Sequence, residues 1–230
     1  MYQREKENSL ITGWDKISIS IDFDNIEQYC SMLNRTLEKE QIIFNENVQK
    51  AVGNMDENEK ASFYEYRSDD HWRLHDVFPS FHWNSTFVTA YSLFEYHLND
   101  ICECLQDKSE SKIKVKIIKG KGIERSKIYL SAIWNLHDCF NGENWSSIKD
   151  YALIRNRLVH NSGELNLDKN GPKDHKRIGE LLEKKFDAIE INKDGEFGIG
   201  RIKSKSSLVI ESIRIYKSFL FTLCDMEKPS

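Results

Sequence analysis

The chain has 230 residues, of which 39% are hydrophobic and 11% aromatic, so it can bury the core of one ordinary domain and is not disordered throughout. With 33 basic against 37 acidic residues, the formal net charge of −4 excludes a protein that binds nucleic acid through its overall charge, and leaves only a local basic patch. The sequence has no run of roughly 18 apolar residues that would span a membrane and no apolar secretion signal, and its five cysteines are an odd number for a disulfide scaffold. We therefore expect a cytoplasmic protein that does not contact membranes.

The first elements are predicted from alternation and from a capping pattern. Residues 17–23 (ISISIDF) alternate between apolar and polar side chains, which predicts a short strand or an extended arm. Asp24 is followed three residues later by Glu27, the spacing of a helical capping box. This pattern predicts an amphipathic helix from Asp24 to about residue 50.

A second capping box divides the N-terminal part of the chain. Asp56 and Glu59 repeat the same spacing and predict a helix that continues to about residue 76. Pro79 predicts a break in the helical structure. We therefore expect two parts, a helical extension at residues 1–79 that packs on the core and a main helical domain at residues 80–230.

The main domain reads as a series of amphipathic helices with one hairpin. Apolar residues recur at steps of three and four from residue 80 onward, which is the pattern of helices that bury one face. The predicted helices cover residues 80–106, 123–137, 144 or 146 to 160, 174–185 and 206–225. Residues 188–199 alternate on both sides of Lys193-Asp194-Gly195, which predicts a β-hairpin. The expected fold is all-α, a helical bundle with one small β-hairpin near the C-terminus.

The segment IRNRLVHNSG contains the pattern Arg155-Asn156-x-x-x-His160. Asn156 and His160 are four residues apart and share a helix face, so the amide is expected to orient the imidazole. Arg155 lies about 140° from His160 on an ideal helix, at about 100° per residue. We therefore expect a frayed last turn, before Asn161-Ser162-Gly163, to bring His160 back toward the arginine.

The chemistry of these residue types suits the cleavage of a phosphodiester. A histidine near a helix C-terminus is favoured in its protonated form and can give or take a proton. The planar guanidinium of Arg155 matches phosphate oxygens and can stabilise charge at phosphorus. No carboxylate cluster accompanies the pattern, so we expect no metal and no cofactor, with the 2′-hydroxyl of RNA as nucleophile.

The pattern resembles the motif of the HEPN superfamily (higher eukaryotes and prokaryotes nucleotide-binding), in which ribonuclease members carry Arg-x4–6-His, often with a polar residue after the arginine. The resemblance covers roughly residues 80–225 and rests on Arg155, Asn156 and His160. It implies an all-α homodimer with two motifs at one cleft, and an endoribonuclease that needs no metal and leaves 2′,3′-cyclic phosphate ends. It further implies a bacterial toxin or antiviral defence effector, whose partners are RNA and an antitoxin or regulatory protein.

Other polar residues are candidates for supporting roles. Glu95, in the long helix of the main domain, can pair with Arg155, or it can be a solvated helix residue. Arg157 can reach a phosphate, or it can simply be exposed. A lysine-rich run offers the best local patch for RNA, although a solvated loop and helix face explains it more simply. The lysines that we assign to RNA binding are Lys114, Lys116, Lys119 and Lys121.

Two alternatives accompany this interpretation. A non-catalytic HEPN-like module that dimerises or binds a nucleotide or a protein partner would share the fold, and in it His160 would be dispensable. A zinc site at His71 and His75 or at Cys102 and Cys104 is disfavoured, because core cysteines and partly exposed histidines explain these residues better.

Overall fold

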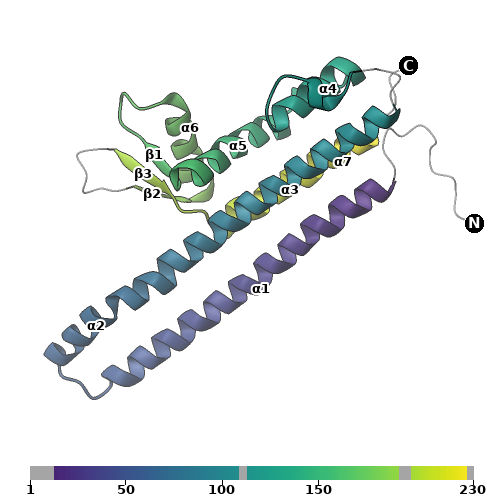
Figure 1. The fold of residues 1–230 in the computed structure, drawn as a ribbon. Helices are drawn as coiled ribbons and strands as arrows, with labels where there is room; N and C mark the ends of the chain where they lie inside the picture. The colour runs from purple at the N-terminus through teal and green to yellow at the C-terminus, as the bar shows by residue number, and fades with distance from the viewer. Residues whose placement is uncertain (1–12, 109–112, 192–197, 227–230) are drawn as a thin grey trace, which may run out of the picture.

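The computed structural model describes residues 13–108, 113–191 and 198–226, and most of this chain is helical (Figure 1). The all-α class expected from the sequence is confirmed. None of the helices within these ranges has the length and apolarity needed to cross a membrane. The helices are α1 (Gly13–Val52), α2 (Glu57–Trp72), α3 (Phe78–Lys108), α4 (Ile123–Trp134), α5 (Glu143–Asn161), α6 (Lys173–Leu181) and α7 (Ser206–Asp225), with π-helical turns at Arg73–Val77 and Leu182–Phe186 and 3-10 turns at Val115–Ile117 and Asp138–Phe140.

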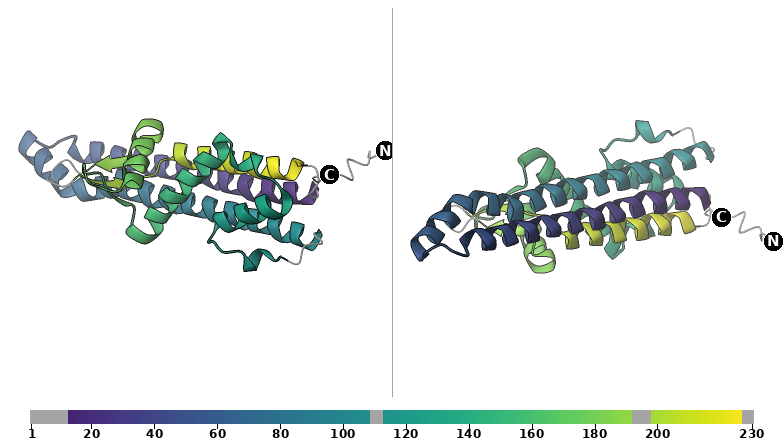
Figure 2. Two further views of the ribbon diagram at one scale, coloured as in Figure 1. Left: turned by 90° about the horizontal axis from the view of Figure 1, so that it is seen from above. Right: turned by 90° about the horizontal axis from the view of Figure 1, so that it is seen from below.

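Helices α3 and α7 form the centre of the bundle, where α1 packs against both of them and α5 packs against them from another side (Figures 1 and 2). The fully buried ring of Tyr216 on α7 joins these helices. It stacks on Phe94 of α3 with ring centroids 4.7 Å apart, and it also contacts Phe23 of α1 and Tyr151 of α5 at 6.2 and 5.8 Å. One aromatic core therefore connects the helices that carry the candidate site.

The apolar stripe of the long central helix is confirmed. The apolar residues that recur at steps of three and four are buried in α3, and they are Phe87, Tyr91, Phe94, Leu98, Ile101 and Leu105. The predicted helices at 123–137, 144–160 and 206–225 are also present, as α4, α5 and α7, with ends that differ by a few residues.

The predicted strand at residues 17–23 is wrong, because this segment lies inside α1. Ile19 and Phe23 are buried and four residues apart, whereas Ile17 and Ile21 are 49% and 53% exposed. Helical spacing therefore decides which of the alternating residues enter the core. The predicted helix start at Asp24 is also wrong, since α1 begins at Gly13 and the Asp24 carboxylate instead accepts a hydrogen bond from Lys217 of α7.

The second capping box is confirmed at the start of α2. The Asp56 carboxylate accepts hydrogen bonds from the backbone N–H groups of Asn58 and Glu59, and the Glu59 carboxylate accepts one from the N–H of Asp56. The predicted break at Pro79 is wrong, because α2, the π-helical turn and α3 form one continuous helical rod. Pro79 has no N–H to donate to a preceding carbonyl, and the π-helical turn Arg73–Val77 directly before it interrupts the regular α-helical hydrogen-bond ladder at that place.

The predicted boundary between an extension and a main domain falls inside that rod. Ile19, Phe23 and Cys30 of α1 belong to the same buried cluster as the residues of α3 and α7. The first half of α1 therefore packs on the core. The sequence predicts packing of this kind for the N-terminal extension.

The small sheet contains one strand more than the predicted hairpin. Strands β2 (Ile189–Ile191) and β3 (Ile199–Ile202) are antiparallel, and their predicted turn at Lys193-Asp194-Gly195 lies outside the described residues. Strand β1 (Glu164–Asn166), which the sequence did not predict, pairs with the other edge of β3 and gives the order β1-β3-β2. The sheet lies next to the end of α5 (Figure 1).

Candidate active site

Helix α5 presents the sequence motif at its C-terminal end. Its buried residues Trp145, Ile148, Tyr151 and Ile154 recur every three residues and hold the helix on the bundle. The helix ends at a left-handed Ser162 and at Gly163 with φ of 79°, and the N–H groups of both residues donate to the carbonyl of Arg157. A Cβ at Gly163 would approach Leu158 and Ile202 to 3.2 and 3.3 Å, so only glycine fits without strain.

An open groove of about 660 Å³ runs between α5, α3 and the start of α4. It brings together five residues that the sequence analysis assigned to the site, and these are Glu95, Lys121, Arg155, Asn156 and His160. Tyr91, Gly122, Ile123, Glu124, Lys149, Asp150, Ala152, Leu153 and Arg177 complete the lining. Residues from four separate parts of the chain therefore line the groove that contains the Arg-x4-His pattern.

Arg155 is held in the groove but keeps donors free. Its Nη1 donates to Asn156 Oδ1 at 3.1 Å, and its guanidinium carbon lies 5.7 Å from the centroid of the Tyr91 ring. Its Nε is buried and has no hydrogen-bond partner among the described residues. Because this Nε is buried, a phosphate in the groove would meet the Nη groups of the partly exposed side chain, and a positioned guanidinium can bind an anion in this way.

The expected role of Asn156 is not the one that the structure gives it. No hydrogen bond joins Asn156 to His160 among the described residues, and the amide instead accepts the bond from Arg155. Asn156 therefore orients the arginine. The expected frayed turn is also wrong, because α5 stays helical through Asn161 and His160 is an exposed residue of its last turn.

Glu95 lies in the groove without pairing directly with Arg155. Within the described ranges, no ion pair joins these two residues. The carboxylate lies instead against Gly122, where a Cβ would approach Oε1 to 2.8 Å and where φ is 55°. Burial raises the pKa of Tyr91, and the negative charge of Glu95 raises it further while Arg155 opposes the shift. The Tyr91 phenol therefore stays protonated near neutral pH, and Glu95 acts on the groove through its charge.

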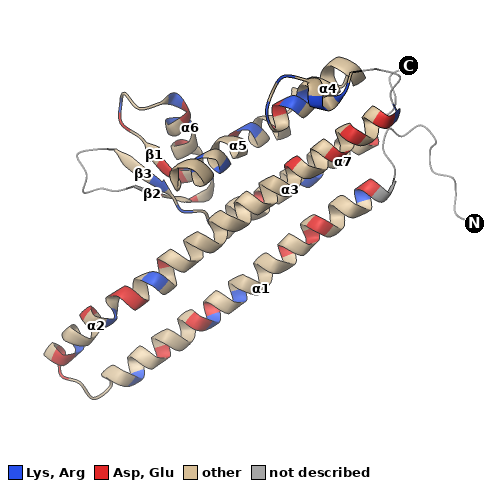
Figure 3. Cartoon of the chain, in the orientation of Figure 1, with Lys and Arg blue, Asp and Glu red and all other residues tan. Residues whose placement is uncertain are grey.

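The lysines of the predicted basic patch lie just before the start of α4, where Figure 3 shows blue segments, and only part of the patch lines the groove. Lys121 lines the groove, whereas Lys114, Lys116 and Lys119 are exposed on the preceding segment and do not line it. Arg157 also lies outside the lining, and it forms an ion pair with Asp174 of α6 at 3.4 Å. The structure thus places one lysine of the predicted patch at the site.

The sequence analysis missed two cations that line the groove. Lys149 lies on α5, seven residues before Asn156 and eleven before His160, a spacing that places all three on one helix face. That spacing was a usable signal. Arg177 of α6 reaches the groove and forms an ion pair with Asp150 at 2.7 Å, which no local pattern indicates because the two residues are distant in the sequence.

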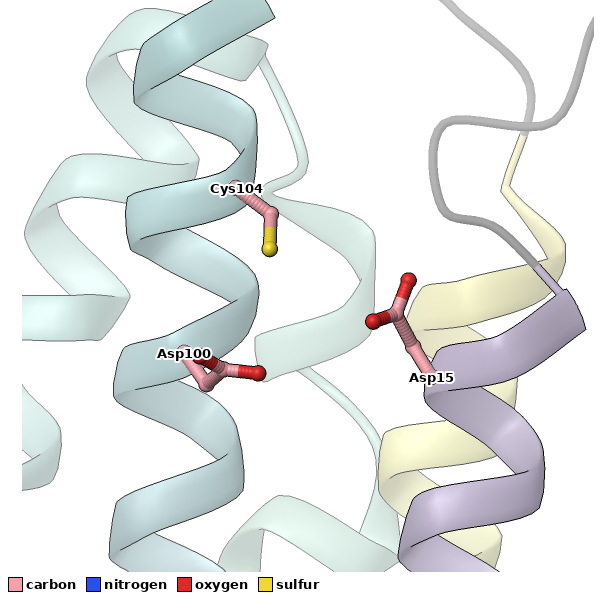
Figure 4. Close-up of side chains that lie close together, drawn as sticks. All are labelled: Asp15, Asp100 and Cys104. Carbon is pink, nitrogen blue, oxygen red and sulfur yellow. The ribbon is translucent and has the colours of Figure 1, made fainter.

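Possible metal ligands gather away from this groove. His71 and His75 stack with ring centroids 4.2 Å apart, and Cys102 is buried. Ligand atoms of Asp15, Asp100 and Cys104 lie within 4.8 Å of one another where α1 and α3 run side by side (Figure 4). Burial, followed by the charges of Asp100 and Asp15, raises the pKa of the Cys104 thiol, so this group lacks the thiolate that binds metals best.

The function is inferred from the geometry of the groove, because the comparisons with known proteins give no match. No protein-family model, no curated protein and no solved structure matches this chain.

Proposed function

We propose that the chain is a metal-independent endoribonuclease that cleaves RNA in the groove formed by α3, α4 and α5. The observation that supports the proposal is the shared position of Arg155 and His160 in the lining of one groove, where Asn156 holds the arginine. Lys121 and Lys149 line the same groove and add positive charge for a phosphate backbone. An exposed histidine and a held arginine in the same groove supply the groups that proton transfer and charge stabilisation at a phosphodiester need.

The proposed reaction uses the nucleophile that RNA itself carries. His160 takes the proton of a ribose 2′-hydroxyl, and the 2′-oxygen forms a bond to phosphorus while the bond from phosphorus to the 5′-oxygen breaks. Arg155 stabilises the charge that builds on the phosphate oxygens. The 5′-oxygen leaves with a proton, so the products carry a 2′,3′-cyclic phosphate and a 5′-hydroxyl.

A homodimer belongs to the same proposal. One His160 can accept the proton of the nucleophile, but the leaving oxygen also needs a donor. A two-fold contact between two copies would bring a second Arg155 and a second His160 to one phosphate. On the HEPN resemblance we also propose the role of a bacterial toxin or antiviral effector in the cytoplasm, controlled by an antitoxin or regulatory protein.

Matched variants test the proposal. His160→Ala should lower the cleavage rate by about 10²–10⁴-fold, the usual contribution of a general acid or base. Arg155→Ala should lower it by about 10²–10³-fold, the usual cost of removing a donor to developing charge. Both side chains lie on the groove surface, so the free energy of unfolding should change by only about 1 kcal/mol or less. His137→Ala and Arg35→Ala, at residues that do not line the groove, serve as controls and should cut at the wild-type rate. Rates from a fluorescent RNA and urea titrations give both quantities.

Three outcomes would contradict the proposal. Full cleavage by folded His160→Ala protein would place the reaction elsewhere and favour a non-catalytic role for the groove. A fully active monomer in light scattering at the assay concentration would contradict the shared site. Loss of folding in His160→Ala would show that the histidine is structural.

A further inference from the structure

A second hollow, of about 270 Å³, lies beside the end of α5 and is separate from the groove that holds Arg155. It lies between the junction of α2 and α3 and the strand β3. Ser162, which caps α5 two residues after His160, is part of its wall. Two residues of chain span at most about 7 Å, so the hollow begins close to the proposed catalytic histidine.

The hollow displays exposed aromatic rings. Trp72 is 56% exposed and Phe81 is 69% exposed, and both line it. On a regular α-helix these residues, nine apart, would face opposite sides at about 100° per residue. The π-helical turn Arg73–Val77 lies between them and holds more residues per turn, which lets both rings reach the same hollow.

The polar groups of the hollow leave one cation available. Lys203 Nζ lies 2.6 Å from Asp76 and 3.9 Å from Glu190, so its charge is already compensated. The side chain of Arg201 is exposed and forms no hydrogen bond or ion pair with a described residue, although its partners across the sheet are Glu164 and Glu190. Aromatic faces beside a free guanidinium are the features with which proteins bind unpaired bases and the adjoining phosphate.

We propose that this hollow binds an unpaired base of a single-stranded RNA, next to the nucleotide that is cut. The proposal rests on the proposed function and names its substrate class, a strand whose bases are free to stack. The base stacks on Trp72 and Phe81, and Arg201 contacts the phosphate that follows. A base-paired strand cannot present its ring faces in this way.

Binding of an uncleavable strand tests the inference separately from catalysis. The probe is a fluorescent single-stranded oligonucleotide with 2′-O-methyl at every ribose, followed by anisotropy with the full-length chain. Trp72→Ala and Phe81→Ala should each weaken binding by roughly 5- to 140-fold, the range expected for the loss of one stacked base. Trp72→Phe should keep most of the affinity, because it retains an aromatic ring.

Tyr66→Ala is the matched control, since Tyr66 is 79% exposed on α2 and does not line the hollow. This variant should bind like wild type. Equal binding by Trp72→Ala and wild type would overturn the inference while leaving RNA cleavage intact, and it would leave the hollow to a protein partner. An equal loss in Tyr66→Ala would also overturn it. Wild-type protein that binds the probe through Trp72 but cuts no RNA would contradict the proposed function alone, and a wild type that does not bind the probe would overturn both.

Discussion

The helical bundle and the arm that projects from it differ in how much of their surface they bury. Helix α3 contributes eleven buried residues to the bundle, whereas α2 contributes none. In the arm, defined here as residues 31–76, only Val48 and Val52 are buried (Figures 1 and 2). Two paired helices without a third layer bury only a narrow strip, so most of the folding free energy must come from the bundle. The bundle therefore positions the residues of the groove, whereas the arm supplies side chains at the edge of the bundle.

Core truncation should show the largest difference between the two regions. Phe94 is fully buried against Tyr216, so Phe94→Ala should lower the free energy of unfolding by about 3–5 kcal/mol. Phe63 is only half-buried in α2, and Phe63→Ala should cost about 1 kcal/mol or less. Urea denaturation measures both variants. Equal costs would mean that the arm is as well packed as the bundle.

Removing the helix cap should affect the arm alone. Asp56→Ala deletes both hydrogen bonds that its carboxylate accepts at the start of α2, which typically costs about 1 kcal/mol. Because the arm can open without the bundle, hydrogen exchange in α2 should accelerate while exchange in α3 and α7 stays unchanged. Mass spectrometry of exchanged peptides measures this. A matching acceleration in α7 would show that arm and bundle open together.

A partly exposed ion pair should contribute less. Arg157→Ala removes the contact with Asp174, which should lower the free energy of unfolding by about 1 kcal/mol at most. RNA affinity should stay at the wild-type value, because Arg157 does not line the groove. Lys121→Ala is the comparison variant and should weaken RNA binding. Weaker binding by Arg157→Ala than by Lys121→Ala would restore the role predicted from the sequence.

The ionisation of a buried histidine in the bundle should leave the free energy of unfolding unchanged at neutral pH and lower it in acid. Burial lowers the pKa of His97, which lies 3.1 Å from Asp22 of α1, below its ordinary value of 6.5. The folded chain then binds fewer protons than the unfolded chain below pH 6.5, so the free energy of unfolding falls as the pH decreases from there. Urea titrations at several pH values should show a shallower fall for His97→Gln. An identical pH dependence in both proteins would contradict this assignment.

The parts of the fold that the sequence predicts are those specified by local spacing. The stripe of α3 and the capping box at Asp56 are local patterns, and both are confirmed. The segment at residues 17–23 is ambiguous, since alternating isoleucines fit a strand until packing buries only Ile19 and Phe23. Strand β1 was missed because three residues with one buried Leu165 carry no signal without their distant partner Gly200.

The same distinction between local spacing and distant contacts applies to the candidate site. The motif on α5 and the lysine at its groove were predicted from nearby residues, and Lys149 could have been found from helical spacing. The bond from Arg155 to Asn156 and the ion pair of Arg157 with Asp174 depend on side-chain geometry and on a second helix. The aromatic hollow depends on a π-helical turn, for which the sequence has no simple periodic pattern.

The central claim is that the groove of the bundle cuts RNA through the 2′-hydroxyl. The most direct measurement is to incubate the full-length chain with total RNA in EDTA and to sequence the cut ends by a method that captures 2′,3′-cyclic phosphates. We predict cuts with 2′,3′-cyclic phosphate and 5′-hydroxyl ends for wild type and for His137→Ala, and none above background for His160→Ala. Cuts that leave 3′-hydroxyl ends, cuts that require an added divalent metal, or equal cutting by His160→Ala would contradict the account.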